Sequence, residues 1–592
     1  MKGDFLVDKN KRKFVFSEII ENIGLYVIGV LTFFISLFLF VVSMLHTVAI
    51  EIVREGEGSD NVVNTIREML ESVIYYNDNF VFNIAFLILS LLICFIVLAR
   101  IRKIKLPFKI LFLFFWTVAL STVWVISSQV APTEDSGMVS GAALAAAEDK
   151  FDFLNDRYFK NYSFQLGYVF FNEIIIRIHN HFTPFKSFVF IQVINAVFLG
   201  IINIFSVMIT DRLFKDERIT NLCVFLLSLS IVPIISCVFV YGILPGMAFA
   251  IVAVYCEIRY ILDNKKILGI VSALCICIAM MIKSNYLIWL IAMCGILFVM
   301  TWKRKKYIWD IVILILMVVP SMMIQPTIKS MYEKRSGVEL GDSIPYASWI
   351  AMGLNETDLA PGWYNYFHTL TNFEISEFNA SVASERSVEE IKNRIKYFKE
   401  NPQYMNDFFY KKTVSQWNET SYESIWNNTV RGQYKEKGNI SDWVCYKKPK
   451  QVKKYIDIFA QLVFCGFFFG CIFMMKKKNF CLVPFPLIFL GGFLYQMISE
   501  GKSQYIVPYF IIMTAFSAVG ITYLSDIFRK NFGDRMICGI IYGKNNDIQQ
   551  ENSEKISEET VPEQMNSVED SVMQEITDSQ QTNSQEDNNN VR

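Results

Sequence analysis

Two adjacent acidic residues, Glu134 and Asp135, follow a long apolar stretch of the chain. A carboxylate just beyond a membrane segment can reach both water and a lipid headgroup, and it can accept a proton from a hydroxyl group. Cations can neutralise a departing phosphate, and both cations and aromatic residues follow in the same loop: Arg157, Tyr158, Lys160 and Tyr162. The loop is a candidate site for sugar transfer from a membrane-anchored phosphate. The alternative is a solvated loop whose charges have no chemical role.

A second polar cluster is the short segment SEGKSQY, Ser499 to Tyr505, between two apolar runs near the end of the chain. Glu500 and Lys502 lie in it, and Tyr505 closes it. Lys502 can pair with a lipid phosphate as a point charge. The alternative is that its charged end only reaches toward the membrane interface while its stem stays in lipid.

Two further turns contain polar residues among apolar runs. MIKSNYLIW contains Lys283 and Asn285, and VFVYGILPG contains Tyr241. Asn, Gly and Pro are the residues that tight turns use in any case. We therefore favour a structural explanation for both segments, with substrate contact as the alternative.

The apolar residues that must position these clusters occur in long blocks. The 592-residue chain is 53% hydrophobic, and its apolar runs have lengths of about 20 residues, enough to cross a bilayer. This pattern predicts an all-α polytopic membrane protein with about 12 transmembrane helices. The formal net charge of +0 gives no basic character that would indicate nucleic-acid binding. We expect the spans near 21–46, 80–99, 106–128, 186–210, 219–238, 243–262, 266–283, 286–302, 307–325, 457–475, 480–498 and 504–526.

The orientation of these spans follows from the positions of Lys and Arg, because cytoplasmic loops carry an excess of both residues. The basic clusters all fall on one side if the span assignment is right, which predicts a multi-pass protein of the cell membrane with both termini in the cytoplasm. The domains that follow are a cytoplasmic N-terminus 1–20, a transmembrane core 21–325 with an outer loop 129–185, an extracytoplasmic domain 326–456, C-terminal transmembrane helices 457–526, and a cytoplasmic, disordered acidic tail 527–592.

Two outer segments have helical patterns of their own. Residues 164–182 are apolar but contain Glu173 and Arg177, so we interpret them as a helix in the outer membrane interface rather than a further span. The domain 326–456 is predicted to be a mostly helical lid. Within it, Ser387 is the expected cap of one helix, and Pro402 interrupts the helical pattern.

Four segments, taken in order, resemble the GT-C superfamily of polyprenyl-phosphate-sugar-dependent glycosyltransferases, in particular its bacterial protein-mannosyltransferase-like and aminoarabinose-transferase-like branch. They are TEDSGMVSGAA, YFKNYSFQLGYVFFNE, MGLNETDLAPGWYN and SEGKSQYIVPYF. The resemblance implies a GT-C-like fold and an inverting transfer of a sugar from a polyprenyl-phosphate donor to an extracytoplasmic acceptor, which would be a cell-surface glycan, a glycolipid or a protein.

The resemblance also implies roles for individual residues. Asp135 would be the catalytic base, with Glu134 beside it. The Glu-Asp order and the two additional spans before the loop depart from the family pattern and leave the base open between these two residues. The donor phosphate and lipid would contact Arg157, Lys160 and Lys502, and further substrate contacts would come from Tyr158, Tyr162, Glu500 and Tyr505. A divalent cation, Mg or Mn, held by Glu134 and Asp135 is a further option.

Two other functional classes fit a chain with many spans. One is a polysaccharide polymerase or ligase that works on pyrophosphate-linked glycans. The other is a non-enzymatic transporter of a lipid-linked sugar, for which we would expect inverted repeats, broken helices or charges buried in mid-span. Transfer of a labelled polyprenyl-phosphate sugar would separate these classes from the glycosyltransferase.

Overall fold

The computed structural model describes residues 2–53, 70–100, 104–357, 359–429 and 438–542. The chain divides into two compact units, Met1–Ser525 and Asp526–Arg592. In the second unit the described residues form the end of the helix α22 (Val507–Tyr542). The disorder predicted for the tail falls largely on 543–592, outside the described residues.

Long apolar helices make up most of the described chain, as the sequence predicts. Nine helices are long and apolar enough to cross a membrane among the described residues. They are the Glu18–Leu45 part of α1 (Lys2–Leu45), α2 (Phe80–Arg100), α3 (Leu106–Ser128), α7 (Val189–Phe214), α10 (Ile243–Asp263), α12 (Leu287–Arg304), α13 (Tyr307–Ser336), α20 (Pro449–Lys477) and the Ser503–Asn531 segment that contains most of α22.

The other predicted spans coincide with less regular helices. Glu217–Leu229 (α8) and Ile231–Val238, which begins with α9 (Ile231–Ile235), form a pair bent by 45° that together passes as one span. The helices α11 (Lys266–Ile282) and α21 (Pro484–Ile498) are apolar but shorter. The polytopic, helical membrane protein is therefore confirmed, and the count of about twelve spans stays a prediction.

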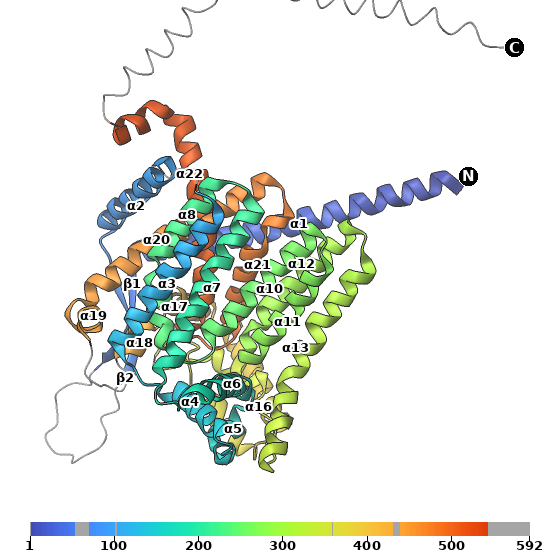
Figure 1. The fold of residues 1–592 in the computed structure, drawn as a ribbon, viewed down its shortest axis with the longest axis vertical. Helices are drawn as coiled ribbons and strands as arrows, with labels where there is room; N and C mark the ends of the chain where they lie inside the picture. The colour runs from blue at the N-terminus through green and yellow to red at the C-terminus, as the bar shows by residue number, and fades with distance from the viewer. Residues whose placement is uncertain (1, 54–69, 101–103, 358, 430–437, 543–592) are drawn as a thin grey trace, which may run out of the picture. The chain divides into compact units, whose positions relative to one another are not determined.

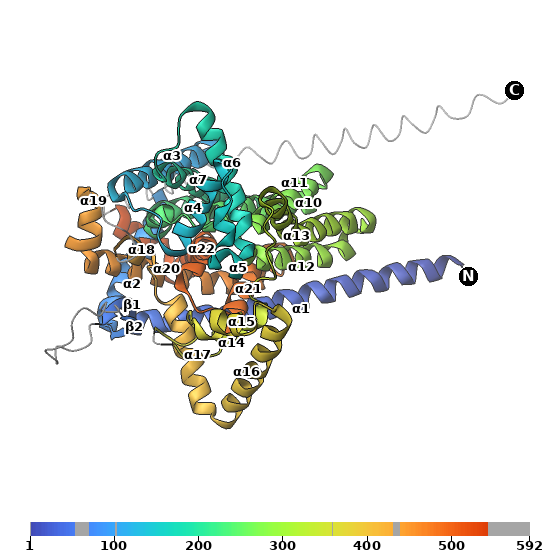
Figure 2. The same ribbon diagram turned by 90° about the horizontal axis from the view of Figure 1, so that it is seen from below.

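The transmembrane helices pack side by side, with α3 against α7, α7 against α10, and α10 against α11 (Figure 1). At one end of this bundle lie three helices of the outer loop, α4 (Glu134–Ala147), α5 (Arg157–Asn161) and α6 (Leu166–Phe182). The segment 326–456 supplies α14 (Tyr346–Gly353), α15 (Asn372–Ile375), α16 (Ala380–Glu400), α17 (Pro402–Trp417), α18 (Ser424–Thr429) and α19 (Asn439–Asp442). Figure 2 shows α16 and α17 as a projecting helical hairpin.

Two of the basic clusters that set the predicted orientation lie at tight connections between helices. Lys215 ends α7 and Lys305 ends α12, and both adopt positive φ angles, 51° and 56°, that close a helix. Asp263 at the end of α10 accepts ion pairs from Arg212 and Arg259. The charges therefore also join neighbouring helix ends, while the side of the membrane on which they lie stays a prediction.

The prediction of an all-α protein is wrong in one segment. His46–Val53 (β1) and Leu70–Asn77 (β2) form a two-stranded antiparallel sheet in which His46 pairs with Asn77. Val48 and Val73 are buried on one face of this sheet, against Trp363. The alternation of apolar and polar residues in HTVAIEIV is typical of a strand with one buried face.

Three predictions about the outer helices concern α6, Ser387 and Pro402. The helix α6 is not among the described helices that pass as spans, and it packs against α4. The expected cap at Ser387 is wrong. Asn379 caps α16, and Ser387 lies buried within it, bonded to the Ser348 hydroxyl at 2.9 Å. Pro402 does begin a new helix, since it is the first residue of α17.

Candidate active site

A cavity of about 630 Å³ lies where three parts of the chain meet: residues 129–185 (the predicted outer loop), the tips of the transmembrane helices, and residues 326–456 (the predicted lid segment). Its walls come from the start of α4, the 158–165 segment, the turns around Tyr241 and Lys283, the 343–370 segment, and the 495–505 turn. Such a volume accommodates a substrate of drug-like size or larger. Residues more than 350 positions apart in the sequence, for example Asp135 and Tyr505, thus face one space.

Asp135 lies in the first turn of α4, on the cavity wall. The preceding residue, Glu134, has a φ of 49°, in the left-handed region that residues with side chains rarely adopt. The Tyr241 hydroxyl donates to Asp135 Oδ2 at 3.1 Å, and Gln165 Nε2 donates to the Tyr241 oxygen at 2.7 Å. Burial, and then the Asp135 charge, raise the pKa of Tyr241 well above its usual value. Tyr241 therefore stays neutral and orients the carboxylate of Asp135.

Lys283 extends into the same space from the turn between α11 and α12. Its Nζ lies 3.7 Å from the centre of the Tyr241 ring and donates to the Tyr241 carbonyl at 3.3 Å. It forms no ion pair with any residue in the described part of the chain. Burial lowers the pKa of Lys283 to about 7, although Asp135 and Glu500 act in the opposite direction. Lys283 is thus a cation without a carboxylate partner that faces a cavity.

The 499–505 turn forms the wall that carries Glu500 and Lys502. Glu500 is buried and accepts a hydrogen bond from the Tyr505 hydroxyl at 3.1 Å. Burial raises the pKa of Glu500, against the lowering effects of Lys502 and Tyr505. Lys502 also lines a small chamber of about 20 Å³ beside Glu134 and Asp135, which is enough for about one water molecule.

Aromatic side chains form much of the remaining wall. Trp349, Trp363, Tyr364 and Tyr366 come from the lid segment. The Tyr162 hydroxyl lies 3.0 Å from the Tyr364 hydroxyl and joins the outer loop to the lid. Aromatic faces with polar edges suit the apolar faces and hydroxyl rims of sugars.

The structure brings most of the sequence-predicted site residues to this cavity. Those that line it are Glu134, Asp135, Tyr158, Tyr162, Glu500, Lys502 and Tyr505. Their chemical roles stay predictions.

Arg157 and Lys160, predicted to contact the donor phosphate, are not among the lining residues. Arg157 pairs with Glu374 at the surface, with Nη2 to Oε2 at 2.6 Å, and Lys160 is exposed. The short helix α5 explains the difference, because residues four apart share a face. Tyr158 and Tyr162 point inward, and the two cations lie on the opposite face.

Gln165 is a cavity residue that the sequence did not indicate, and Tyr241 and Lys283 are two cavity residues for which we favoured a structural explanation. The latter two lie in turns for which Gly, Pro and Asn already supply a structural reason. The available signal was that both turns fall on the predicted outer side, the same side as the acidic loop.

The arrangement offers little for a dedicated metal centre among the described residues. No group of three or more His, Cys, Asp or Glu side chains is placed to hold an ion there. Glu134 and Asp135 alone would leave most of the coordination shell of Mg or Mn to water or substrate. The divalent cation stays a prediction.

The fold and the cavity together define a polytopic integral membrane protein with a cavity lined by charged and aromatic side chains. A protein family described as "conserved hypothetical integral membrane protein" matches residues 33–521, and the chain belongs to this family. The match includes every residue of the cavity wall. No curated protein matches the chain.

Proposed function

We propose that this protein is an integral-membrane glycosyltransferase that moves a sugar from a polyprenyl-phosphate donor to an extracytoplasmic acceptor. The observation that carries the proposal is the convergence of Asp135, Lys283 and Lys502 on one aromatic-lined cavity of about 630 Å³. A base, cations for a phosphate and aromatic surfaces for sugars are the parts that this reaction needs. The resemblance of the outer-loop and 499–510 segments to GT-C enzymes is in line with it.

In the proposed reaction, the acceptor hydroxyl attacks the anomeric carbon of the donor sugar. Asp135 takes the proton of that hydroxyl as the new carbon–oxygen bond forms. The bond between the anomeric carbon and the phosphate oxygen breaks, and the polyprenyl phosphate leaves with the electron pair. Lys283 and Lys502 stabilise the negative charge of the leaving phosphate. Attack from the face opposite the phosphate inverts the anomeric configuration.

Three features support Asp135 over Glu134 as the base. The Tyr241 hydroxyl donates to Asp135, and Gln165 holds that hydroxyl in turn. Tyr158 is also close enough for the Asp135 charge to raise its pKa, after burial. The Tyr158 hydroxyl is buried beside Asp135 and Tyr241 and forms no hydrogen bond of good geometry among the described residues. A substrate hydroxyl placed between Asp135 and Tyr158 would satisfy both groups.

The proposal includes a membrane arrangement. The helices α1 to α22 would cross the bilayer about twelve times, with α6 in the outer interface and residues 326–456 as the lid. Both termini would be cytoplasmic and the cavity extracytoplasmic, in the manner of a GT-C fold. The basic clusters at Lys215 and Lys305 support this orientation through the excess of cations in cytoplasmic loops.

The test uses purified full-length protein in nanodiscs and a panel of radiolabelled polyprenyl-phosphate sugars. The native protein should release polyprenyl phosphate and transfer the sugar to a cell-envelope extract that serves as the acceptor. Asp135→Asn should do neither. Size-exclusion behaviour and thermal unfolding of both proteins control for folding. Full transfer by Asp135→Asn, or no turnover of any donor by the native protein, would remove the basis of the proposal.

A lipid-linked sugar transporter is the second candidate, and two observations favour it. The α8–α9 pair is bent by 45°. Glu257 in α10 is 1% exposed, and within the described ranges neither of its carboxylate oxygens has a hydrogen-bond partner. Broken helices and buried intramembrane charges are features of transporters. The same nanodisc experiment separates the two classes, since a transporter would not cleave the sugar–phosphate bond.

A further inference from the structure

The 499–505 turn carries Glu500 and Lys502 but has little support from its own backbone. Between α21, which ends at Ile498, and the short helix that begins at Ser503, the chain has no regular structure. The contacts that fix it come from the lid segment. The Gly501 amide donates to the Gly362 carbonyl at 2.6 Å. Gly353 packs so closely that an added Cβ would lie 2.4 Å from the Ser499 carbonyl oxygen.

A buried lysine holds the first end of this turn. Lys412 in α17 is 0% exposed. Its Nζ donates to the Ser499 carbonyl at 2.7 Å and also to the Gly353 carbonyl. Lys412 forms no ion pair with any carboxylate in the described ranges, and burial lowers its pKa to about 7. A buried lysine side chain is costly, so its retention here indicates a specific purpose for the two bonds.

Buried glutamates hold the second end. Glu419 is 1% exposed and accepts a hydrogen bond from the Ser503 hydroxyl at 3.0 Å. Glu423 is fully buried and accepts one from the Gln504 amide at 3.2 Å. Tyr422 and Glu423 adopt positive φ angles of 48° and 57°, so the backbone between the two carboxylates is in a conformation that is rare for residues with side chains.

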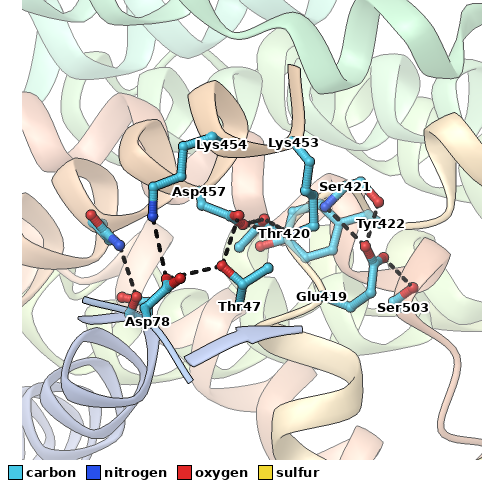
Figure 3. A network of polar contacts seen from close by, with 12 residues as sticks. Thr47, Asp78, Glu419, Thr420, Ser421, Tyr422, Lys453, Lys454, Asp457 and Ser503 are labelled. Atoms are coloured by element: carbon cyan, nitrogen blue, oxygen red, sulfur yellow. Dashed lines mark hydrogen bonds and ion pairs between the residues drawn. The ribbon is translucent and has the colours of Figure 1, made fainter. Parts of the chain in front are cut away.

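The loop that presents Glu419 is itself part of a wider polar network (Figure 3). Thr420 and Lys453 both donate to Asp457 of α20. Thr47 of the β1 strand bridges Asp457 and Asp78, at 3.3 and 2.9 Å. The glutamate loop is therefore anchored to α20 and to the hairpin, independently of the turn it holds.

We propose that Lys412 and Glu419 are positioning residues that fix the 499–505 turn from its two ends, so that Lys502 is held ready for an anionic group in the cavity. They touch no substrate themselves. The identity of the anion as a lipid phosphate rests on the proposed function, whereas the positioning of the turn does not.

The first experiment measures hydrogen exchange of the full-length protein by mass spectrometry, over peptides that include residues 499–505. Lys412→Met should accelerate exchange in this turn by about tenfold, because one of its charge-assisted anchors is lost. Gly353→Ala should act in the same direction by pushing the Ser499 carbonyl away without removing a charge. Lys411→Met is the matched control, since Lys411 is an exposed neighbour that pairs with Asp407. Unchanged protection in both test variants would overturn the proposal.

The second experiment measures binding of undecaprenyl monophosphate to the same proteins. Lys412→Met should weaken binding by about tenfold, and it should add less than about twofold in a Lys502→Ala background, because its effect acts through Lys502. Full additivity of the two losses would contradict the positioning role. If the native protein does not bind this lipid at all, the donor in the proposed function is wrong, and the exchange experiment still decides on the turn.

Discussion

Two clusters of carboxylates and cations, one near each end of α4, have opposite settings. At the C-terminal end, the buried carboxylate of Glu173 accepts from Arg177 Nε at 2.9 Å, Arg335 Nη2 at 2.7 Å and the Tyr332 hydroxyl at 2.5 Å. Arg177 also bonds to Asp149, at 2.5 Å. At the N-terminal end, Asp135 accepts from a neutral tyrosine, and the nearby Lys283 has no carboxylate partner in the described structure.

The difference distinguishes charges that hold the fold from charges that are available to a ligand. In the Glu173 cluster the opposite charges satisfy one another and join α6 to α13. In the cavity the charges are held apart by Tyr241, which bonds to Asp135 and lies under Lys283. A buried lysine without a carboxylate partner, such as Lys283, is costly in a partly desolvated cavity, and an anionic ligand there would offset this cost.

The largest expected effect comes from exchanging one carboxylate for an amide at each end of α4. Asp135→Asn should lower sugar transfer by about 10²–10⁴-fold, because an amide cannot accept the proton. Asp149→Asn should change it less than about threefold, since its partners Arg177 and Arg335 both keep Glu173. Initial transfer rates at saturating donor measure both. Equal losses of sugar transfer in Asp135→Asn and Asp149→Asn would contradict the distinction between charges that hold the fold and charges available to a ligand.

The free energy of unfolding should be affected in the opposite way, with a larger loss for a change in the Glu173 cluster than for a change at Asp135. Glu173→Gln leaves Arg177 and Arg335 without their buried partner and should cost about 2–3 kcal/mol of unfolding free energy, a value reduced for the partial exposure of both arginines. Burial raises the pKa of Glu173, but bonds from Arg335, Tyr332 and Arg177 outweigh it, so the pKa is lowered. The contribution is thus present at neutral pH and is lost on acidification. Thermal unfolding in detergent, with Asp135→Asn as the comparison, checks this.

The sequence was sufficient for the acidic residues and for Lys502 of the cavity wall, and insufficient for the other cations. Asp135 and Glu500 could be found because each lies in a short polar segment at the end of an apolar run. Lys283 also lies at such a point, but a single lysine in a turn has an adequate structural explanation. Arg157 was expected at the phosphate, yet its direction depends on Glu374, more than 200 residues away.

The same limit applies to the fold. Apolar runs identify the transmembrane helices because the length of a span is a local property. The β1–β2 hairpin depends on two residues of the lid segment. It packs against Trp363, and the Val73 amide donates to the Leu359 carbonyl at 3.1 Å. Likewise, Ser387 resembles a cap in sequence but is buried against Ser348 through a contact that only the tertiary structure supplies.

A smaller effect, on lipid binding, is expected when single lysines are replaced. Lys283→Met should weaken binding of undecaprenyl monophosphate by about tenfold, because one charge-assisted contact is lost. Lys160→Met should leave it unchanged within about twofold, since Lys160 is exposed and does not line the cavity. Isothermal titration or fluorescence quenching of the lid tryptophans gives both affinities. A greater loss in Lys160→Met would favour the sequence-based assignment over the structural one.

The smallest expected effect is on the pH dependence of that binding. The pKa of Lys283 is lowered to about 7, mainly by burial, so its side chain is cationic below this pH and largely neutral above it. A bound phosphate favours the cationic form, and binding should therefore weaken by a few-fold as the pH rises from about 6 to about 8. The Lys283→Met variant subtracts the titration of the lipid phosphate itself, which both proteins share. The difference in binding affinity between the native protein and Lys283→Met should fall as the pH rises, and it should follow a single ionisation. A constant difference over this range would mean that Lys283 keeps its charge throughout, as a solvated lysine does, and that the cavity does not desolvate it.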